Sequence, residues 1–246
     1  MKLLNILAFS LVYKSIFNIS KKKNMDLLDT LILDNKRLKE DYPLITVGDF
    51  TTKFVPNQNR SLNIRRIADI VKLVLIKPGE TFSLNGFVGK RTKKKGFLIA
   101  KMILNHRIVK TRGGGVSQFA TTLFNSAFNA GLDITKYQFH SIYYDRYPYG
   151  LCATISWGGP DLRIRNNSSY PITIRSSSTN NSVRVEILAK KKIVEDLKTQ
   201  QFTKKEGVCT NVTTVRTRYL SDDTILKDNF YALYRKEGFY CNGSSS

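Results

Sequence analysis

The feature that most constrains the fold is an uncharged stretch in the middle of the chain. Three consecutive glycines, Gly113 to Gly115, lead through Val116 and Ser117 into residues 118–130, which contain no charged side chain. The apolar residues of this stretch are Phe119, Leu123, Phe124, Ala127 and Phe128. Charged residues make up 24% of the whole chain, so a surface helix of this length normally carries several. A helix without any charge has no face suited to water. We predict a central, buried helix over 118–130 that ends at Gly131.

The flanking segments predict an α+β fold. Ile64, Ile67, Ala68 and Val71 follow a helical spacing behind the capping residues Asn59 and Ser61, which indicates a second helix. Short apolar runs between turn residues indicate strands. They lie at 73–76, 97–104, 107–110, 153–157, 162–165, 172–175, 183–188, 212–220 and 225–234. We therefore expect one buried helix packed on a mostly antiparallel sheet, with a C-terminal β-hairpin that turns at 221–223.

Two single residues receive structural assignments from this pattern. His106 lies with Asn105 at the tip of the hairpin formed by 97–104 and 107–110, where we expect it to be exposed. Trp157 ends the predicted strand at 153–157, and we expect it in the core.

The charge balance narrows the classes of partner. The chain has 40 Lys plus Arg against 19 Asp plus Glu, a formal net charge of +21, while 41% of its 246 residues are hydrophobic. This composition excludes a disordered or acidic solvating protein. A basic surface suits nucleic acid, an anionic membrane or an anionic wall polymer. Nucleic acid is disfavoured as a partner because no zinc finger or aromatic RNA-binding pair is present. We interpret the densest basic run, Lys90 to Lys95, as solvated surface.

Cysteine and histidine are too few for a metal centre. The chain has three cysteines, Cys152, Cys209 and Cys241, and two histidines, His106 and His140, with no Cys-x-x-Cys or His-x-x-x-His pair. We predict neither a metal nor another cofactor. An odd number of cysteines leaves at least one thiol unpaired and does not fix the compartment.

The N-terminal 45 residues have two interpretations. Lys2 followed by an apolar stretch from Leu3 to Tyr13 is similar to a short signal or anchor segment that could associate with a membrane. The other interpretation is the remnant of an upstream region. We divide the rest into a main domain at 46–190 and a C-terminal hairpin extension with a frayed tail at 191–246.

Several short motifs occur in a distinctive order along the chain. They are Glu80 to Asn85, Val88-Gly89 with Arg91-Thr92, Gly113 to Gln118 leading into Thr121 to Asn125, His140-Ser141, Ala153 to Trp157, and Asp161. In order and spacing, these motifs resemble the VanW family over about residues 48–188. The resemblance implies a bacterial, extracytoplasmic cell-envelope protein whose partner is peptidoglycan or another wall polymer. Some members with Cys in the glycine-rich motif are linked to transpeptidase-type cross-linking of peptidoglycan. The Ser-Gln and Thr-Thr-Leu-Phe-Asn context here is similar to a Ser-bearing subgroup.

The residues themselves suggest a catalytic site. Consecutive glycines allow positive φ angles and close backbone approach, so they can bend the chain and present N–H groups. Ser117 then begins a helix as a candidate nucleophile, with His140 as its base and Asp161 as the residue that orients the imidazole. The amides of Gly114 and Gly115 would stabilise an oxyanion.

Further residues are candidates for ligand binding. They are Gly113, Gly114, Gly115, Gln118 and Arg91 from the matched motifs, and Tyr144 and Arg146, which with Tyr143 and Tyr147 could line a groove for a peptide or sugar. Cys152 stands where the family usually has an acidic residue, and nothing in the sequence activates it as a nucleophile.

Three functions remain open from the sequence. The first is acyl transfer on peptidoglycan stem peptides by Ser117, which would depend wholly on a base because serine is not ionised at neutral pH. The second is a non-catalytic module that binds wall polymer in the same cleft, with Ser117 serving only as a helix cap. The third, nucleic-acid binding, is remote. As an alternative to a catalytic role, His140 and Asp161 could form hydrogen bonds that hold a loop and a turn.

Overall fold

The computed structural model describes residues 44–56, 58–104, 107–236 and 241, with side chains described except for 103–108. Every element below belongs to one compact unit, Ile45–Ser246. The expectations for residues 1–43 and for His106 at the hairpin tip lie outside the described residues. Within the described part of the chain, no helix is both long enough and apolar enough to cross a membrane.

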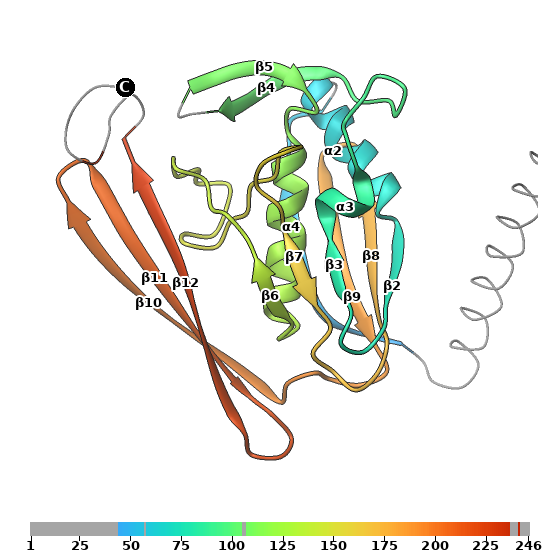
Figure 1. Cartoon of the computed structure of the whole chain (residues 1–246), viewed down its shortest axis with the longest axis vertical. Helices are drawn as coiled ribbons and strands as arrows, with labels where there is room; N and C mark the ends of the chain where they lie inside the picture. Colours follow the sequence, from blue (N-terminus) through green and yellow to red (C-terminus); the bar gives the residue numbers. More distant parts are fainter. Residues whose placement is uncertain (1–43, 57, 105–106, 237–240, 242–246) are drawn as a thin grey trace, which may run out of the picture. The chain divides into compact units, whose positions relative to one another are not determined.

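A four-stranded antiparallel sheet forms one layer (Figure 1). Its strand order is β1 (Ile45–Lys53), β9 (Ser182–Ala189), β8 (Ile172–Ser178) and β2 (Leu73–Ile76). Helix α2 (Asn59–Ile70) precedes β2 and buries Ile64, Ile67 and Ala68, as its spacing predicted. The first strand was not predicted, although Ile45 to Lys53 pairs along the whole of β9.

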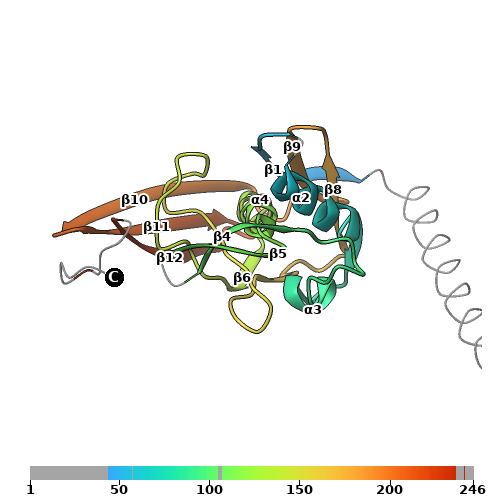
Figure 2. The ribbon, with the colours of Figure 1, turned by 90° about the horizontal axis from the view of Figure 1, so that it is seen from above.

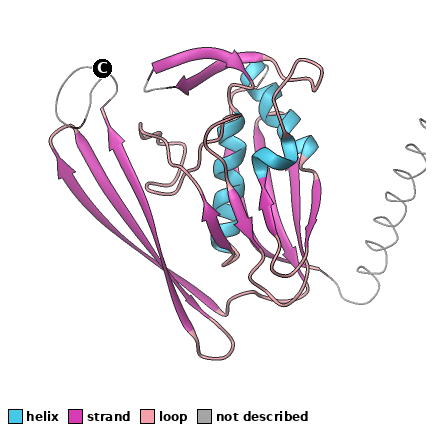
Figure 3. Cartoon of the chain, in the orientation of Figure 1, coloured by secondary structure: helices cyan, strands magenta, loops and turns pink. Residues whose placement is uncertain are grey.

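Three smaller sheets complete the unit. One contains β3 (Thr81–Ser83), β7 (Arg163–Arg165) and β6 (Asp133–Lys136), with the short helix α3 (Leu84–Val88) after β3. A second is the hairpin of β4 (Ile99–Leu104) and β5 (Arg107–Arg112). The third joins β10 (Asp196–Glu206), β11 (Cys209–Tyr219) and β12 (Ile225–Arg235). Figure 3 shows how strands outnumber helices throughout, which confirms the α+β prediction.

Helix α4 (Val116–Asn129) is the centre of this arrangement. Seen from above, it lies between the four-stranded sheet and the β3–β7–β6 sheet, with the C-terminal sheet on a third side (Figure 2). Every residue from Val116 to Phe128 is buried except Ser117. The prediction of a central buried helix is therefore confirmed.

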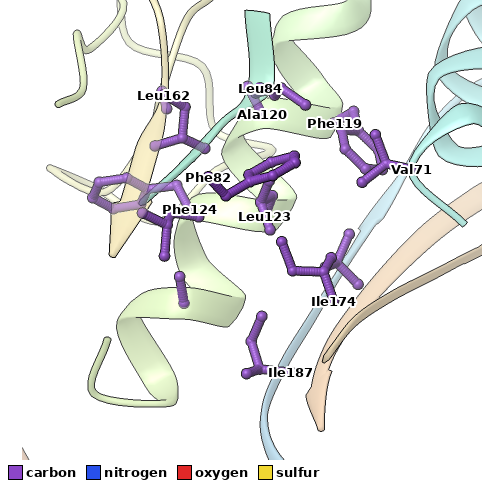
Figure 4. Close-up of a cluster of buried hydrophobic side chains, with 14 of the residues drawn as sticks. Val71, Phe82, Leu84, Phe119, Ala120, Leu123, Phe124, Leu162, Ile174 and Ile187 are labelled. Atoms are coloured by element: carbon purple, nitrogen blue, oxygen red, sulfur yellow. The ribbon is translucent and has the colours of Figure 1, made fainter. Parts of the chain in front are cut away.

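The apolar core surrounds this helix (Figure 4). Phe119, Leu123 and Phe124 are fully buried on α4. They pack with side chains from both sheets and from residues that adjoin the elements, among them Phe82, Ile174 and Ile187, Val71 just after α2, and Leu162 just before β7. Gly48 of β1 lies so close to the helix that a Cβ there would stand 2.5 Å from the backbone of Ser126 and Ala130. The helix and the sheet are thus in direct backbone contact.

The C-terminal sheet is attached through buried arginines. The side chain of Arg216 is fully buried, and it donates to the carbonyl oxygens of Phe128 at 3.0 Å and Leu132 at 2.9 Å. Arg218 donates to the carbonyl of Gly131 at 2.9 Å. These carbonyls lie at or just beyond the C-terminal end of α4, where cations are favoured by the helix dipole. The predicted hairpin is present, with β10 as a third strand that was not predicted.

Two predictions near residue 157 were wrong. Residues 153–157 do not form a strand, because the N–H groups of Ala153 and Ile155 bond to side chains of α4. Trp157 is 55% exposed rather than buried, since it lies in the turn that follows, where Gly159 donates to Ser156. In the basic run, Lys90, Lys93, Lys94 and Lys95 are exposed as expected, whereas Arg91 is buried.

The cysteines form one disulfide. Cys209 at the start of β11 is bonded to Cys241, and Cys152 is a buried free thiol. Among the described residues, no group of three or more His, Cys, Asp or Glu is placed to hold a metal ion.

Candidate functional site

The glycine bend is held by close backbone packing. Gly113 and Gly115 have φ angles of 83° and 103°, a region that favours glycine. A Cβ on Gly114 would stand 2.4 Å from the carbonyl oxygen of Ala100. Asn63 of α2 donates to the carbonyls of Leu98 and Gly114, both at 2.9 Å. The bend thus joins the β4–β5 hairpin, α2 and the start of α4.

A first row of polar residues on α4 binds the segment 151–155. Ser117, Thr121 and Asn125 recur at intervals of four, so they share one face of the helix. The Ser117 hydroxyl accepts from the N–H of Ile155 at 3.2 Å and shares a 3.2 Å hydrogen bond with the hydroxyl of Thr154. Thr121 bonds both the N–H and the carbonyl of Ala153, and Asn125 donates to the carbonyl of Leu151. These side chains bond the backbone groups of 151–155 that a neighbouring strand would bond in a sheet.

A second row binds the four-stranded sheet. Gln118, Thr122 and Ser126 also recur at intervals of four. The fully buried amide of Gln118 donates to the Thr52 hydroxyl at 3.0 Å and the Lys53 carbonyl at 2.8 Å. Ser126 donates to the carbonyl of Val185 at 2.9 Å. The polar side chains of this uncharged helix are therefore hydrogen-bonded to neighbouring backbone rather than buried unpaired.

A pocket of about 310 Å³ opens at the N-terminal end of α4. Segments far apart in the sequence line it: Val55, Gln58, Arg60, Lys101, Met102, Gly115, Ser117, Gln118, His140, Tyr144, Arg146, Tyr147 and Thr154. Ser117 and His140 thus lie in one pocket, as do the predicted binding residues Gly115, Gln118, Tyr144 and Arg146.

The pocket carries positive charge. Three of its lining residues, Arg60, Lys101 and Arg146, are cationic, and none of the lining residues is Asp or Glu. Arg60 donates to the Gln118 side-chain oxygen at 2.7 Å and is also hydrogen-bonded to Tyr147. Burial lowers the pKa of Arg60 below its ordinary value. The arrangement suits an anionic ligand.

His140 is neutral in this environment. Burial, and then the charges of Arg60 and Arg146, lowers the pKa of His140 to about 4. Its ring stacks on Tyr147 with centroids 5.5 Å apart, and its Nδ1 is buried without a hydrogen-bond partner. A base with so low a pKa is poorly matched to removing a proton from serine at neutral pH.

Asp161 lies elsewhere and does not orient His140. One carboxylate oxygen accepts from Ser83 at 2.7 Å and Arg163 at 3.0 Å, and the other accepts from the N–H of Asn85 at 2.9 Å. These hydrogen bonds lower the pKa of Asp161 against the opposing effect of burial. Asp161 therefore holds the start of α3, and it is not among the residues that line the pocket with Ser117 and His140.

Three further predicted binding residues have structural roles. Gly113, Gly114 and Arg91 are not among the residues that line the pocket. The N–H of Gly114 donates to the carbonyl of Thr111 at 3.3 Å, so it is not directed at an oxyanion. Arg91 is buried against Gly113 and donates to the Gly89 carbonyl at 3.2 Å.

Sequence reasoning missed part of the site. Arg60 and Lys101 line the pocket but were not singled out, and Thr154, which also lines it, was quoted only within the Ala153 to Trp157 motif. Arg60 lies one turn before Ile64 on the same face of a predicted helix, and a basic residue in the first turn of a helix is typical of ordinary surface. Only its contact with Gln118, 58 residues away, identifies it.

The fold and pocket define an α+β protein with a cationic site at the start of a buried, uncharged helix. Its sequence matches the VanW-like protein family over residues 59–188, and the chain belongs to this family. It is 40% identical over 131 residues to the uncharacterized protein YoaR of Bacillus subtilis, covering 53% of this chain and 43% of that protein. It is 30% identical over 116 residues to the vancomycin B-type resistance protein VanW of Enterococcus faecalis, covering 45% of this chain and 42% of that protein.

The matched region spans less than half the length of each of these relatives. No solved structure matches the chain significantly. The family relation to vancomycin resistance proteins is therefore established by sequence.

Proposed function

We propose that this protein binds peptidoglycan fragments in the pocket at the start of α4, outside the cytoplasm and without making a covalent bond to them. Family membership supports an envelope function, because a VanW protein of vancomycin resistance is among the relatives. The cationic lining supports an anionic ligand, and peptidoglycan stem peptides carry carboxylates.

The observation that carries binding over catalysis is the hydrogen bonding of Ser117. Its hydroxyl is shared with Thr154 and Ile155 and fixes the end of the segment 151–155. An activated serine instead hydrogen-bonds its base, whereas the side chain of His140 makes no such bond to Ser117 among the described contacts. Ser117 therefore shapes the pocket.

The disulfide supports the extracytoplasmic location. Cys209 and Cys241 are bonded, and disulfides persist chiefly in oxidising surroundings such as the bacterial periplasm or cell surface. Mass spectrometry of the alkylated protein from intact cells tests this point. We expect one alkylated cysteine without reduction, and three alkylated cysteines without reduction would contradict it.

Calorimetric titration with purified muropeptides, together with chromatography of the mixture, tests the proposal. We expect saturable binding by the full chain and no change in the muropeptides after prolonged incubation. Ser117→Ala should bind within about tenfold of the parent, since one neutral hydrogen bond contributes about 1 kcal/mol. Absence of binding by a folded parent protein would contradict the proposal.

Acyl transfer by Ser117 is the second candidate, favoured by the presence of Ser117 and His140 in one pocket. It predicts new cross-linked or shortened products that disappear in Ser117→Ala and His140→Gln. Identical chromatograms for the parent and both variants would remove this candidate and leave binding in place.

A further inference from the structure

We propose that the pocket recognises the free carboxylate of a peptide end, held between Arg60 and Arg146. The inference rests on the proposed function and names the chemical group of the ligand that the pocket binds.

Arg60 is held in place before any ligand arrives. Its guanidinium donates to Gln118, whose amide is itself anchored to Thr52 and Lys53 on β1. Its side chain packs against Gly115, where a Cβ would stand 2.6 Å from Cγ of Arg60. A guanidinium has more N–H donors than these contacts use. A positioned guanidinium binds a carboxylate at little cost in side-chain entropy.

The pocket lacks a counter-charge of its own. Arg146 lies on the loop after His140, with its guanidinium 5.8 Å from the centre of the Tyr144 ring, and Lys101 lines the pocket from β4. No carboxylate lines the pocket with them. The pKa of His140 is lowered first by burial and then by the same positive charges, those of Arg60 and Arg146. A ligand anion would balance this charge.

The remaining wall favours a peptide over a polyol phosphate. Val55, Met102 and the rings of Tyr144 and Tyr147 line the pocket beside the cations. An apolar wall next to a cation suits the aliphatic side chain of a terminal residue and its carboxylate. The phosphates of a glycerol-phosphate polymer lack that apolar group. Ser117 and Thr154, which also line the pocket, provide hydroxyls for the peptide backbone.

The test compares two ligands that differ in one group. The full chain is titrated with a muropeptide that has a free C-terminal carboxylate and with the same muropeptide as its C-terminal amide, and the muropeptide's other carboxylates are amidated in both. We expect the amide to bind at least about tenfold more weakly, because charge-assisted hydrogen bonds are lost. Arg146→Gln should weaken binding of the acid about tenfold and leave binding of the amide unchanged.

Arg184→Gln is the matched control, because Arg184 is half-exposed, pairs with Asp49 and does not line the pocket. It should leave both affinities unchanged. Equal binding of acid and amide would overturn the carboxylate inference while leaving the proposed function intact. Absence of binding by either would overturn both. Tighter binding of a glycerol-phosphate oligomer, in competition with the acid, would assign the pocket to phosphate instead.

Discussion

Arginines lie at both ends of helix α4, but only those at the C-terminal end are paired with carboxylates. At the C-terminal end, Arg216 and Arg218 pair with Asp228 at 2.8 and 2.9 Å, and Arg218 also pairs with Asp133. At the N-terminal end, Arg60 contacts an amide and a tyrosine, and the pocket around it contains no carboxylate.

This difference separates two uses of a cation near a helix end: Arg216 and Arg218 are buried, whereas Arg60 is partly buried and Lys101 and Arg146 are exposed. The C-terminal arginines satisfy helix carbonyls and carboxylates, so they attach the β10–β12 sheet to the helix. The N-terminal cations lie at the positive end of the helix dipole, which disfavours them in the absence of a ligand. A cluster of cations at the positive end of a helix dipole, with no carboxylate beside it, is typical of an anion-binding site.

The largest expected effect is at the C-terminal end. Arg216→Ala leaves Asp228 and the carbonyls of Phe128 and Leu132 without this partner. It should lower the free energy of unfolding in denaturant by about 3 to 5 kcal/mol. Arg184→Ala, at a half-exposed pair with Asp49, should cost at most about 1 kcal/mol. Similar losses in the two variants would mean that the buried arginine does not attach the sheet.

The glycine bend gives the next effect. Gly114→Ala places a Cβ 2.4 Å from a backbone oxygen of Ala100, so it should destabilise the protein by about 1 to 3 kcal/mol. It should also weaken muropeptide binding, because the bend positions Gly115 and Ser117. Gly158→Ala meets no atom within 4 Å at a φ of +78° and should cost about 1 kcal/mol through backbone strain alone. Calorimetric melting of both variants makes the comparison, and a Gly114→Ala protein as stable as the parent would contradict the close packing.

The third effect is a pH dependence at the N-terminal end. The pKa of His140 is about 4 in the folded protein, below its ordinary value of 6.5. The unfolded chain therefore takes up a proton first as the pH falls. Stability from this residue is fully present above about pH 6.5 and is lost between about pH 6.5 and pH 4, by about 2 to 3 kcal/mol after allowance for partial exposure.

Denaturant unfolding at a series of pH values measures this slope. His140→Gln should flatten it, because that variant removes the group whose pKa is lowered on folding. A slope that survives in His140→Gln would assign the pH dependence to other groups.

The smallest effect is expected just beyond the segment held by the polar row. Trp157→Ala should change stability by less than about 1 kcal/mol, because the side chain is 55% exposed. Phe124→Ala in the core should cost about 3 to 5 kcal/mol. Thermal melting compares the two, and a large loss at Trp157 would show that the turn contributes to packing.

The sequence predicted the central helix because its lack of charge is a local property of residues 118–130. It did not predict β10, whose residues are mostly polar and exposed and so lack an alternating pattern. It misassigned 153–157 because apolar residues there face the helix, while their backbone bonds to Thr121 and Ser117 rather than to a strand.

The site was predicted in part for a similar reason. Ser117 and His140 do share a pocket, because the glycine motif and the loop at 140 both lie at the start of α4. Asp161 was misassigned because spacing along the chain does not show that Ser83 and Asn85 occupy its oxygens. Arg60 and Lys101 were missed because a basic residue in a chain with 40 of them has no local signature of a binding role.

The most direct test of the central claim is the unfolding free energy of the parent protein and Arg146→Gln, with and without the carboxylate-bearing muropeptide. Without ligand, we predict equal stability within about 0.5 kcal/mol, because Arg146 is exposed. With ligand at a hundred times the dissociation constant of the parent, the parent should gain about 2.7 kcal/mol and the variant clearly less. A variant that is already destabilised by several kcal/mol without ligand, or that gains as much as the parent, would contradict the claim that the positive charge at this end of the helix serves a ligand.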